Sequence, residues 1–107
     1  MIKVIRQSKA VVRQITGTYK ATNFITKDVS PNVSLAVNEA VNHSETETTD
    51  YDRIYYVLDG ELHIRLKDND YTVYAGDACF ISAHTTYDFS GSFKAVVVNQ
   101  PAFGSKA

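Results

Sequence analysis

The pattern that most constrains the fold lies in the middle of the chain, where two strand-like runs flank an Asp-Gly pair. Residues 51–58 are rich in aromatic and β-branched side chains, as is typical of a strand buried on both faces. Asp59 and Gly60 follow, and this dipeptide tolerates the positive φ angles of a tight turn. Apolar and polar residues then alternate over residues 61–67. We therefore predict an antiparallel β-hairpin here.

Similar patterns recur along the chain, and no stretch shows the periodicity of an amphipathic helix. Further strand-like runs cover residues 11–15, 24–25, 33–41, 71–75, 78–81 and 93–98. About nine short strands, with turns roughly every 8–12 residues, predict an all-β sandwich or barrel. We expect one domain, residues 1–107, that ends in a frayed tail at residues 104–107.

Composition and charge exclude several classes of function. The net charge is −1, and no apolar run approaches the ~20 residues of a membrane span. We therefore expect no nucleic-acid partner and no membrane partner. The single cysteine, Cys79, fits a reducing, cytoplasmic location, and in its apolar strand it is expected to be a small buried hydrophobe. Residues 1–27 carry six basic groups and no acidic one, so they form either a transit peptide or, as we favour, strands beside the acidic later segment.

The longest polar segment, residues 42–50, is predicted to be a loop, and loops on a rigid scaffold often carry function. It contains His43, Glu45 and Glu47, which together with His84 form a candidate set of metal ligands. The spacing of these residues matches no common metal motif, so we expect no cofactor and keep a divalent metal as the alternative. His63, on the polar side of its strand, is expected at the surface.

Two motifs resemble those of the cupin superfamily. Residues 51–62 end in the Gly60 of the first motif, and residues 74–81 contain the Gly76-Asp77 that opens the second. The resemblance covers about residues 33–100 and implies a jelly-roll barrel with a ligand cavity, usually in a homodimer. Residues 1–30 would then supply strands that complete the barrel or the dimer.

The departures from the cupin motifs concern the metal site. Arg53 stands where the family has an acidic ligand, and Tyr87 stands where it has the last histidine. Glu47 or neighbouring threonines fall at the places of the paired histidines. Arginine offers no lone pair and stays cationic, so the usual metal ligands are missing.

Within the cupins, residues 51–62 look most like the ethanolamine-utilisation protein Q group. Members of that group have been linked to acetate-kinase-like activity. We do not carry this activity over, because Arg53 replaces a glutamate of that group.

The resemblance and the strand alternation place Arg53 and Tyr55 inside the barrel, with Tyr87 pointing inward and Tyr51 near the mouth. An inward arginine needs a negative partner. That partner is either an internal carboxylate (Glu47, Asp50 or Asp88) or a carboxylate or phosphate of a ligand. The tyrosines suit planar or sugar-like ligands, or they simply fill the barrel.

The sequence thus leads to competing functional hypotheses. The first is a cupin that binds a small anionic or sugar-like metabolite, with Arg53, Tyr51, Tyr55, Tyr87 and His84 as ligand-binding residues. The alternative is a cupin enzyme (isomerase, lyase or decarboxylase), with His84, Glu47 and Tyr87 as catalytic residues. The third hypothesis is a structural dimer that binds no ligand. In each case we expect a homodimer, paired through an edge strand.

Overall fold

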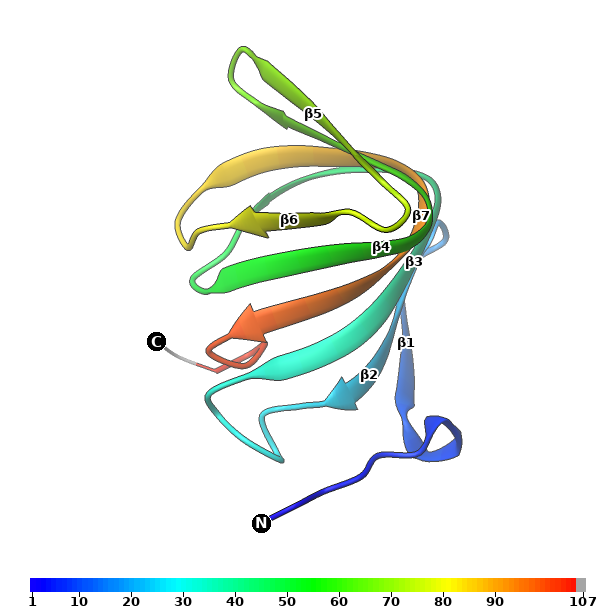
Figure 1. Ribbon diagram of the computed structural model, residues 1–107, viewed down its shortest axis with the longest axis vertical. Helices are drawn as coiled ribbons and strands as arrows, with labels where there is room; N and C mark the ends of the chain where they lie inside the picture. Colours follow the sequence, from blue (N-terminus) through cyan, green and yellow to red (C-terminus); the bar gives the residue numbers. More distant parts are fainter. Residues whose placement is uncertain (106–107) are drawn as a thin grey trace.

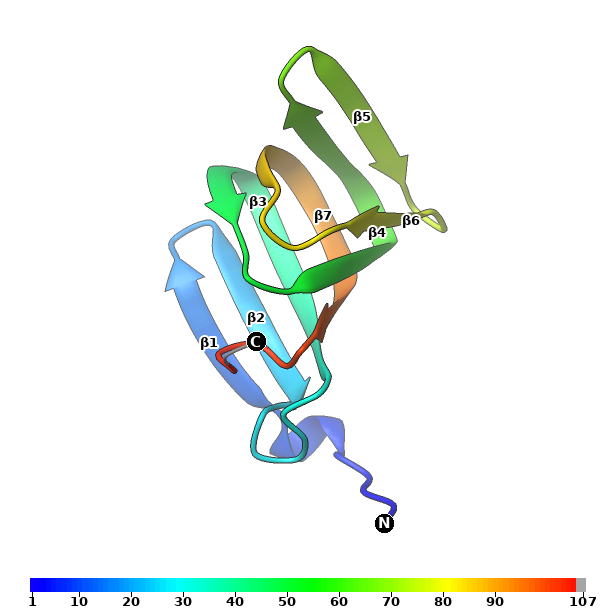
Figure 2. The same cartoon turned by 90° about the vertical axis from the view of Figure 1, so that its left-hand side faces the viewer.

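The computed structural model describes residues 1–105 and consists almost wholly of antiparallel strands (Figure 1). A short 3-10 helix, Gln7–Lys9, precedes the first strand. The strands are β1 (Val11–Thr16), β2 (Tyr19–Ile25), β3 (Ser34–Thr48), β4 (Asp52–Leu66), β5 (Asn69–Tyr74), β6 (Ala78–Ile81) and β7 (Thr86–Gln100). They pair in the order β1-β2-β3-β7-β4-β5, and β6 pairs with β4 (Figure 2). The predicted all-β class is confirmed.

The sheet folds over on itself because its three longest strands bend at a common level. The register of β3 shifts between Ala40 and His43, and that of β4 shifts between Val57 and Asp59. β7 passes this level at Gly91, where φ is 124° and a Cβ atom would collide with the carbonyl oxygen of Glu61. Bulges of this kind increase the local twist and bend a strand. The long strands therefore wrap around the core as a jelly-roll barrel (Figure 1).

The bends divide the barrel into two facing layers. The first layer contains β1, β2, β6 and residues 34–41, 52–58 and 92–100 of the long strands. The second layer contains β5 and residues 43–48, 60–66 and 86–90. The largest fully buried side chains are Tyr55, Val57, Leu62 and Phe89. They come from both layers, so one core holds the two layers together.

The predicted hairpin at Asp59 and Gly60 is wrong. These residues form a bulge inside the continuous strand β4, and β7 pairs with β4 on both sides of it. Gly60 does adopt the positive φ expected of a turn, 77°, and a side chain there would collide with the carbonyl oxygen of Ser92. The positive φ was therefore predicted correctly for Gly60 but not for Asp59, and the place of the pair in the sheet was predicted wrongly.

The predicted loop at residues 42–50 is also wrong, because β3 continues to Thr48 and pairs with β7 along its whole length. The structure has seven strands and not the expected nine or so. The difference arises because β3, β4 and β7 are each continuous over 15 residues and span both layers. Of the tail predicted at residues 104–107, Gly104 and Ser105 lie beyond the last strand, and residues 106–107 lie outside the described residues. Among residues 1–105, no helix has the length and apolar character needed to cross a membrane.

The segment 51–58 is not buried on both faces of the single chain. Its inward residues Arg53, Tyr55 and Val57 are buried as predicted. The outward side chains of Ile54, Tyr56 and Leu58, however, are 41%, 44% and 45% exposed.

Candidate functional site

Arg53 forms the centre of a buried polar cluster between the two layers. Alternation along β4 turns its side chain inward, where the residue is 4% exposed. Its Nη1 donates to Oε2 of Glu47 at 2.7 Å, and its Nε donates to Oδ1 of Asn99 at 2.8 Å. Glu47 lies on β3 in the second layer and Arg53 in the first, so the ion pair links the layers. Of the alternatives left open by the sequence, an internal partner is present, and it is Glu47.

Three tyrosines complete this cluster. Nη1 of Arg53 donates to the hydroxyl oxygens of Tyr55 and Tyr87 at 3.2 and 3.3 Å, and Nη2 donates to that of Tyr51 at 3.3 Å. The guanidinium carbon also lies 5.4 and 5.6 Å from the ring centres of Tyr51 and Tyr55, within the range of cation–π attraction. We call this group the Arg53 cluster; its members are Glu47, Tyr51, Arg53, Tyr55, Tyr87 and Asn99.

The electrostatics of the Arg53 cluster favour a charged arginine and neutral tyrosines. Burial alone would lower the pKa of Arg53, but the facing oxygens of Tyr55, Tyr87 and Glu47 outweigh burial and raise this pKa above its usual value. Burial raises the pKa of Tyr87 to about 12, although the positive charge of Arg53 opposes this. Burial also raises the pKa of Tyr55 and of Tyr51.

A second buried cluster surrounds His43, which is 6% exposed. Its Nε2 lies 2.7 Å from Oε1 of Glu45, and its Nδ1 lies 2.8 Å from the hydroxyl oxygen of Thr18. An ionised carboxylate only accepts hydrogen bonds, so in the neutral imidazole Nε2 donates to Glu45 and Nδ1 accepts from Thr18. The imidazole stacks on the ring of Tyr19, with centroids 4.6 Å apart. We call Thr18, Tyr19, His43 and Glu45 the His43 cluster.

A cavity of about 200 Å³ opens between these clusters. Its polar wall includes Tyr19, Asn38, Glu45, Glu47, Arg53 and Asn99. Arg13 and Ile15 of the edge strand β1 and Phe103 also line it. Asn38 is 7% exposed, and its Nδ2 donates to the hydroxyl oxygen of Tyr19 at 2.7 Å. Its Oδ1 finds no donor within residues 1–105, which is unusual for a buried polar atom.

The structure brings together most of the predicted ligand-binding residues. Arg53, Tyr51, Tyr55 and Tyr87 meet in one cluster, but of these four residues only Arg53 lines the cavity. His84 lies apart from them. It occupies an exposed turn with φ 64°, and its Nδ1 lies 3.6 Å from Asp50.

The four candidate metal ligands lie in three separate places. His43 bonds to Glu45, Glu47 bonds to Arg53, and His84 faces Asp50. In the described part of the chain, no group of three or more His, Cys, Asp or Glu side chains converges. At the positions where cupins hold a metal, the guanidinium of Arg53 and the phenol of Tyr87 face each other, and a cation does not fit between them.

Two other expectations concern single residues. His63 is at the surface as predicted, and its Nδ1 lies 3.2 Å from the hydroxyl oxygen of Thr72. Cys79 is a free thiol that packs partly buried against the core, and burial raises its pKa.

Sequence reasoning missed Thr18, Tyr19, Asn38 and Asn99. Asn38 alone had a visible signal, because it interrupts the small apolar residues Ala36 and Ala40 on the inward side of its strand. A polar residue at an inward position needs a partner. The hydrogen bond between Thr18 and His43 joins residues 25 positions apart, so no local pattern shows it.

The bent antiparallel barrel with its inward-facing cluster defines the class of protein: the chain is a cupin. A solved RmlC-like cupin from Shewanella frigidimarina has the same fold, with a TM-score of 0.81 over 97% of this chain and 95% of that one, at 14% identity. The model of the ethanolamine utilisation protein EutQ family matches residues 2–103, and the chain belongs to this family.

Two solved relatives support this assignment. An ethanolamine utilization protein Q from Salmonella typhimurium is 27% identical, with a TM-score of 0.81 over 94% of this chain and 87% of that one. The EutQ protein of Clostridium difficile is 26% identical, with a TM-score of 0.77 over 95% of this chain and 76% of that one. No curated protein matches the sequence. Both resemblances seen in the sequence, to the cupins and to the ethanolamine-utilisation protein Q group, are confirmed.

Proposed function

We propose that the chain binds a small, hydroxyl-rich, sugar-like metabolite in the cavity between its two polar clusters. The unpartnered, buried Oδ1 of Asn38 is the observation that carries this proposal, because a buried acceptor without a donor is costly unless a ligand supplies one. The carboxylates of Glu45 and Glu47 add acceptors to the same wall. The hydroxyl groups of a ligand can donate hydrogen bonds to these acceptors without adding charge to the cavity.

The charge of the cavity wall favours a neutral ligand. Arg53 is already paired with Glu47, and Glu45 is hydrogen-bonded to His43. A ligand carboxylate would therefore meet two carboxylates that already have their own partners. An anionic ligand is nevertheless a second candidate, because Arg13 lines the cavity alongside Arg53.

The geometry supports binding better than catalysis. Of the candidate catalytic residues, Glu47 and Tyr87 lie in the Arg53 cluster and His84 lies apart from it. The names of the relatives link those proteins to ethanolamine utilisation, and an amino alcohol also presents donors. Ethanolamine is therefore a useful probe beside neutral sugars. A cytoplasmic location belongs to this proposal and is supported by the free thiol of Cys79.

Calorimetric titration of the full chain with a panel of neutral sugars, matched sugar acids and ethanolamine tests the proposal. We expect neutral sugars to bind and Asn38→Ala to weaken their binding about tenfold, the loss of one hydrogen bond. Asn69→Ala, at an exposed position of β5, is the matched control and should leave affinity unchanged. Binding of the sugar acids alone would favour the second candidate. Equal affinities of the wild type and Asn38→Ala would overturn the assignment of the site.

A further inference from the structure

The cavity of the proposed function has a buried floor and an exposed rim. The floor presents buried polar side chains: Tyr19, Asn38, Arg53 and Asn99. The opposite end is lined by Arg13 and Ile15 of β1 and by Phe103, and we call these three residues the rim. All three are exposed, Phe103 by 45%. A ligand that fills the cavity therefore contacts two environments of different chemistry.

The rim carries a positive charge that has no counter-charge in the single chain. Residues 1–27 contain six basic residues and no acidic one. Within residues 1–105, only Lys20 of these six lies within ion-pair distance of a carboxylate, 3.5 Å from Glu39. Arg13 is among the five that have no such partner, and it alone of these five lines the cavity. The rim is therefore the positively charged end of the cavity.

The position of Arg13 leaves its hydrogen-bond donors available. Its guanidinium carbon lies 6.0 Å from the centre of the Phe103 ring, at the limit of cation–π attraction. This contact is not a hydrogen bond, so the five N–H donors of the guanidinium remain for other partners. Arg53, by contrast, engages Nε, Nη1 and Nη2 in hydrogen bonds inside its own cluster. Arg13 is thus the arginine that can hold an anion by two parallel hydrogen bonds.

Strand register sets the spacing between Arg13 and the unpartnered amide of Asn38. Arg13 pairs with Ala21, and Ala21 pairs with Asn38, so the three residues form one inward row across β1, β2 and β3. Two strand spacings separate the ends of this row by about 10 Å. The middle residue is a small, buried alanine that also lines the cavity. A ligand that reaches from Arg13 to Asn38 can therefore lie across Ala21.

The size and the charge of the cavity limit what such a ligand can be. The volume of about 200 Å³ is below the roughly 300–1,000 Å³ of sites for drug-sized ligands, and it suits a single sugar ring. Glu45 and Glu47 line the same cavity from the second layer. Like charges repel, so an anionic group is disfavoured beside these carboxylates and favoured beside Arg13. The hydroxyl groups belong at the floor and the negative charge belongs at the rim.

We propose that Arg13 binds a terminal oxyanion group of the ligand, a phosphate or a carboxylate, while the hydroxyl groups of the same molecule reach Asn38. The ligand is then a monosaccharide with one anionic group at its end. This inference rests on the proposed function, because it takes the sugar-like part of the ligand to fill the cavity. It adds a specificity-determining residue and a charge at a defined place.

Calorimetric titration of the full chain with matched sugars tests the inference. The probes are glucose, galactose and mannose, each beside its 6-phosphate and its uronic acid. We expect at least one anionic derivative to bind about tenfold or more tightly than its neutral parent, the effect of a charge-assisted hydrogen bond. Arg13→Gln should remove this gain and leave the affinity for the neutral parent unchanged. Arg13→Lys should keep only part of the gain, because an ammonium cannot bind an oxyanion with two prongs.

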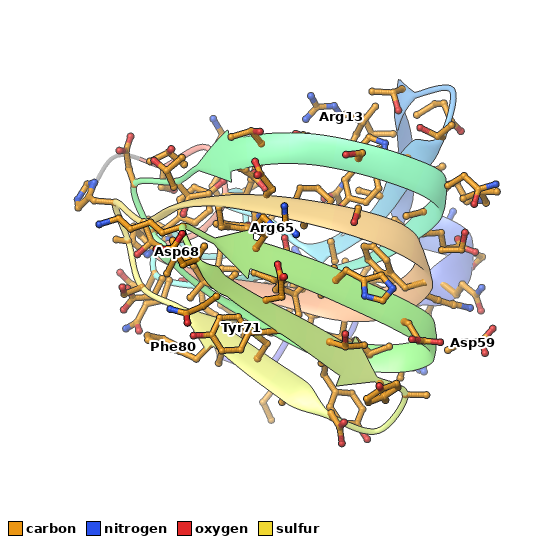
Figure 3. All side chains as sticks on the ribbon, turned by 90° about the horizontal axis from the view of Figure 1, so that it is seen from above. Arg13, Asp59, Arg65, Asp68, Tyr71 and Phe80 are labelled. Carbon is orange, nitrogen blue, oxygen red and sulfur yellow. The ribbon has the colours of Figure 1, made fainter. Side chains whose placement is uncertain are left out.

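Arg65→Gln is the matched control, since it removes the same charge at an exposed position. Arg65 lies over the second layer and Arg13 lies at the β1 edge of the barrel (Figure 3). This variant should keep the full gain, and circular dichroism verifies that each variant folds. The gain should also shrink in high salt, which screens exposed charges, whereas binding of the neutral sugars should not change.

The possible outcomes separate this inference from the proposed function. A gain that depends on Arg13 supports the inference, and the tighter of the two derivatives identifies the oxyanion. Neutral and anionic sugars that bind equally, or an Arg13→Gln variant that weakens both alike, overturn the inference while the sugar site stands. Inorganic phosphate that binds as tightly as the sugar 6-phosphates also overturns it. If no sugar of either kind binds, the proposed function fails together with the inference.

Discussion

The Arg53 cluster and the His43 cluster face the same cavity but satisfy their buried polar groups in different ways. Arg53 is a permanent cation, and it has a carboxylate, an amide and three phenols as partners. His43 has the carboxylate of Glu45, the hydroxyl of Thr18 and the stacked ring of Tyr19 as partners. The comparison teaches that the same barrel holds a guanidinium by surrounding it and holds an imidazole by fixing its two nitrogens. The clusters should therefore differ in how much stability each group contributes.

The largest expected difference comes from replacing each central residue by an apolar one of similar size. Arg53→Met should lower the free energy of unfolding by about 3–5 kcal/mol, because Glu47 loses its cation and Asn99 loses its donor. His43→Leu should lower it by about 1–2 kcal/mol, since the two hydrogen bonds that are lost end on a hydroxyl and on a partly exposed carboxylate that water can solvate. Urea unfolding followed by circular dichroism measures both. Equal losses would contradict the distinction between the clusters.

A matched pair of glutamates on one strand sharpens the comparison. Glu47→Gln should lower the free energy of unfolding by about 2 kcal/mol, because it leaves the buried guanidinium without a counter-charge while water reaches part of the site. Glu45→Gln should cost about 0.5 kcal/mol, since an amide oxygen can still accept from His43. The same unfolding assay applies, and the two variants differ by two positions only. A larger effect of Glu45→Gln would reverse our ranking of the clusters.

Alkaline pH should act mainly through the Arg53 cluster, which holds three tyrosines. An unfolded tyrosine ionises near its pKa of 10.0, while burial raises the pKa of Tyr87 to about 12. Between these values the unfolded state binds fewer protons than the folded state, so stability falls as pH rises. Tyr87→Phe should flatten this fall by about 1.4 kcal/mol per pH unit. Urea unfolding across this pH range measures the slope, and the exposed Tyr71→Phe should leave it unchanged.

The fold and the Arg53 cluster could largely be predicted from the sequence, because alternation along one strand decides which side chains point inward. Arg53 and Tyr55 follow this rule, and the cupin motifs supplied Tyr87. The bends could not be predicted. Gly60 has the positive φ of a turn residue although it lies in a bulge, and only the pairing with the distant β7 on both sides of it excludes a hairpin.

The His43 cluster was hidden for a related reason. Residues 42–48 belong to β3, whose outer face is solvated and whose inner face carries the His43 cluster. Polar residues therefore occur on both faces of this strand, and such a polar run was interpreted as a loop. Thr18 and His43 meet because β2 pairs with β3 up to Tyr19 and Ala40, just before the bulge near Asn42, where φ is 48°. Local residue patterns carry no information on such a contact.

The smallest expected effect concerns the hydroxyl of Thr18, the only donor bonded to Nδ1 of His43 within residues 1–105. Thr18→Val keeps the shape of the side chain but leaves this buried nitrogen without a donor, which should cost about 1 kcal/mol. Thr48→Val, which breaks an exposed bond to Thr86, should cost less because water replaces the lost partner. Urea unfolding of both variants measures the difference. If Thr18→Val were neutral, the imidazole would be held by stacking on Tyr19 alone, and the contrast between a surrounded charge and a ring fixed through both nitrogens would fail.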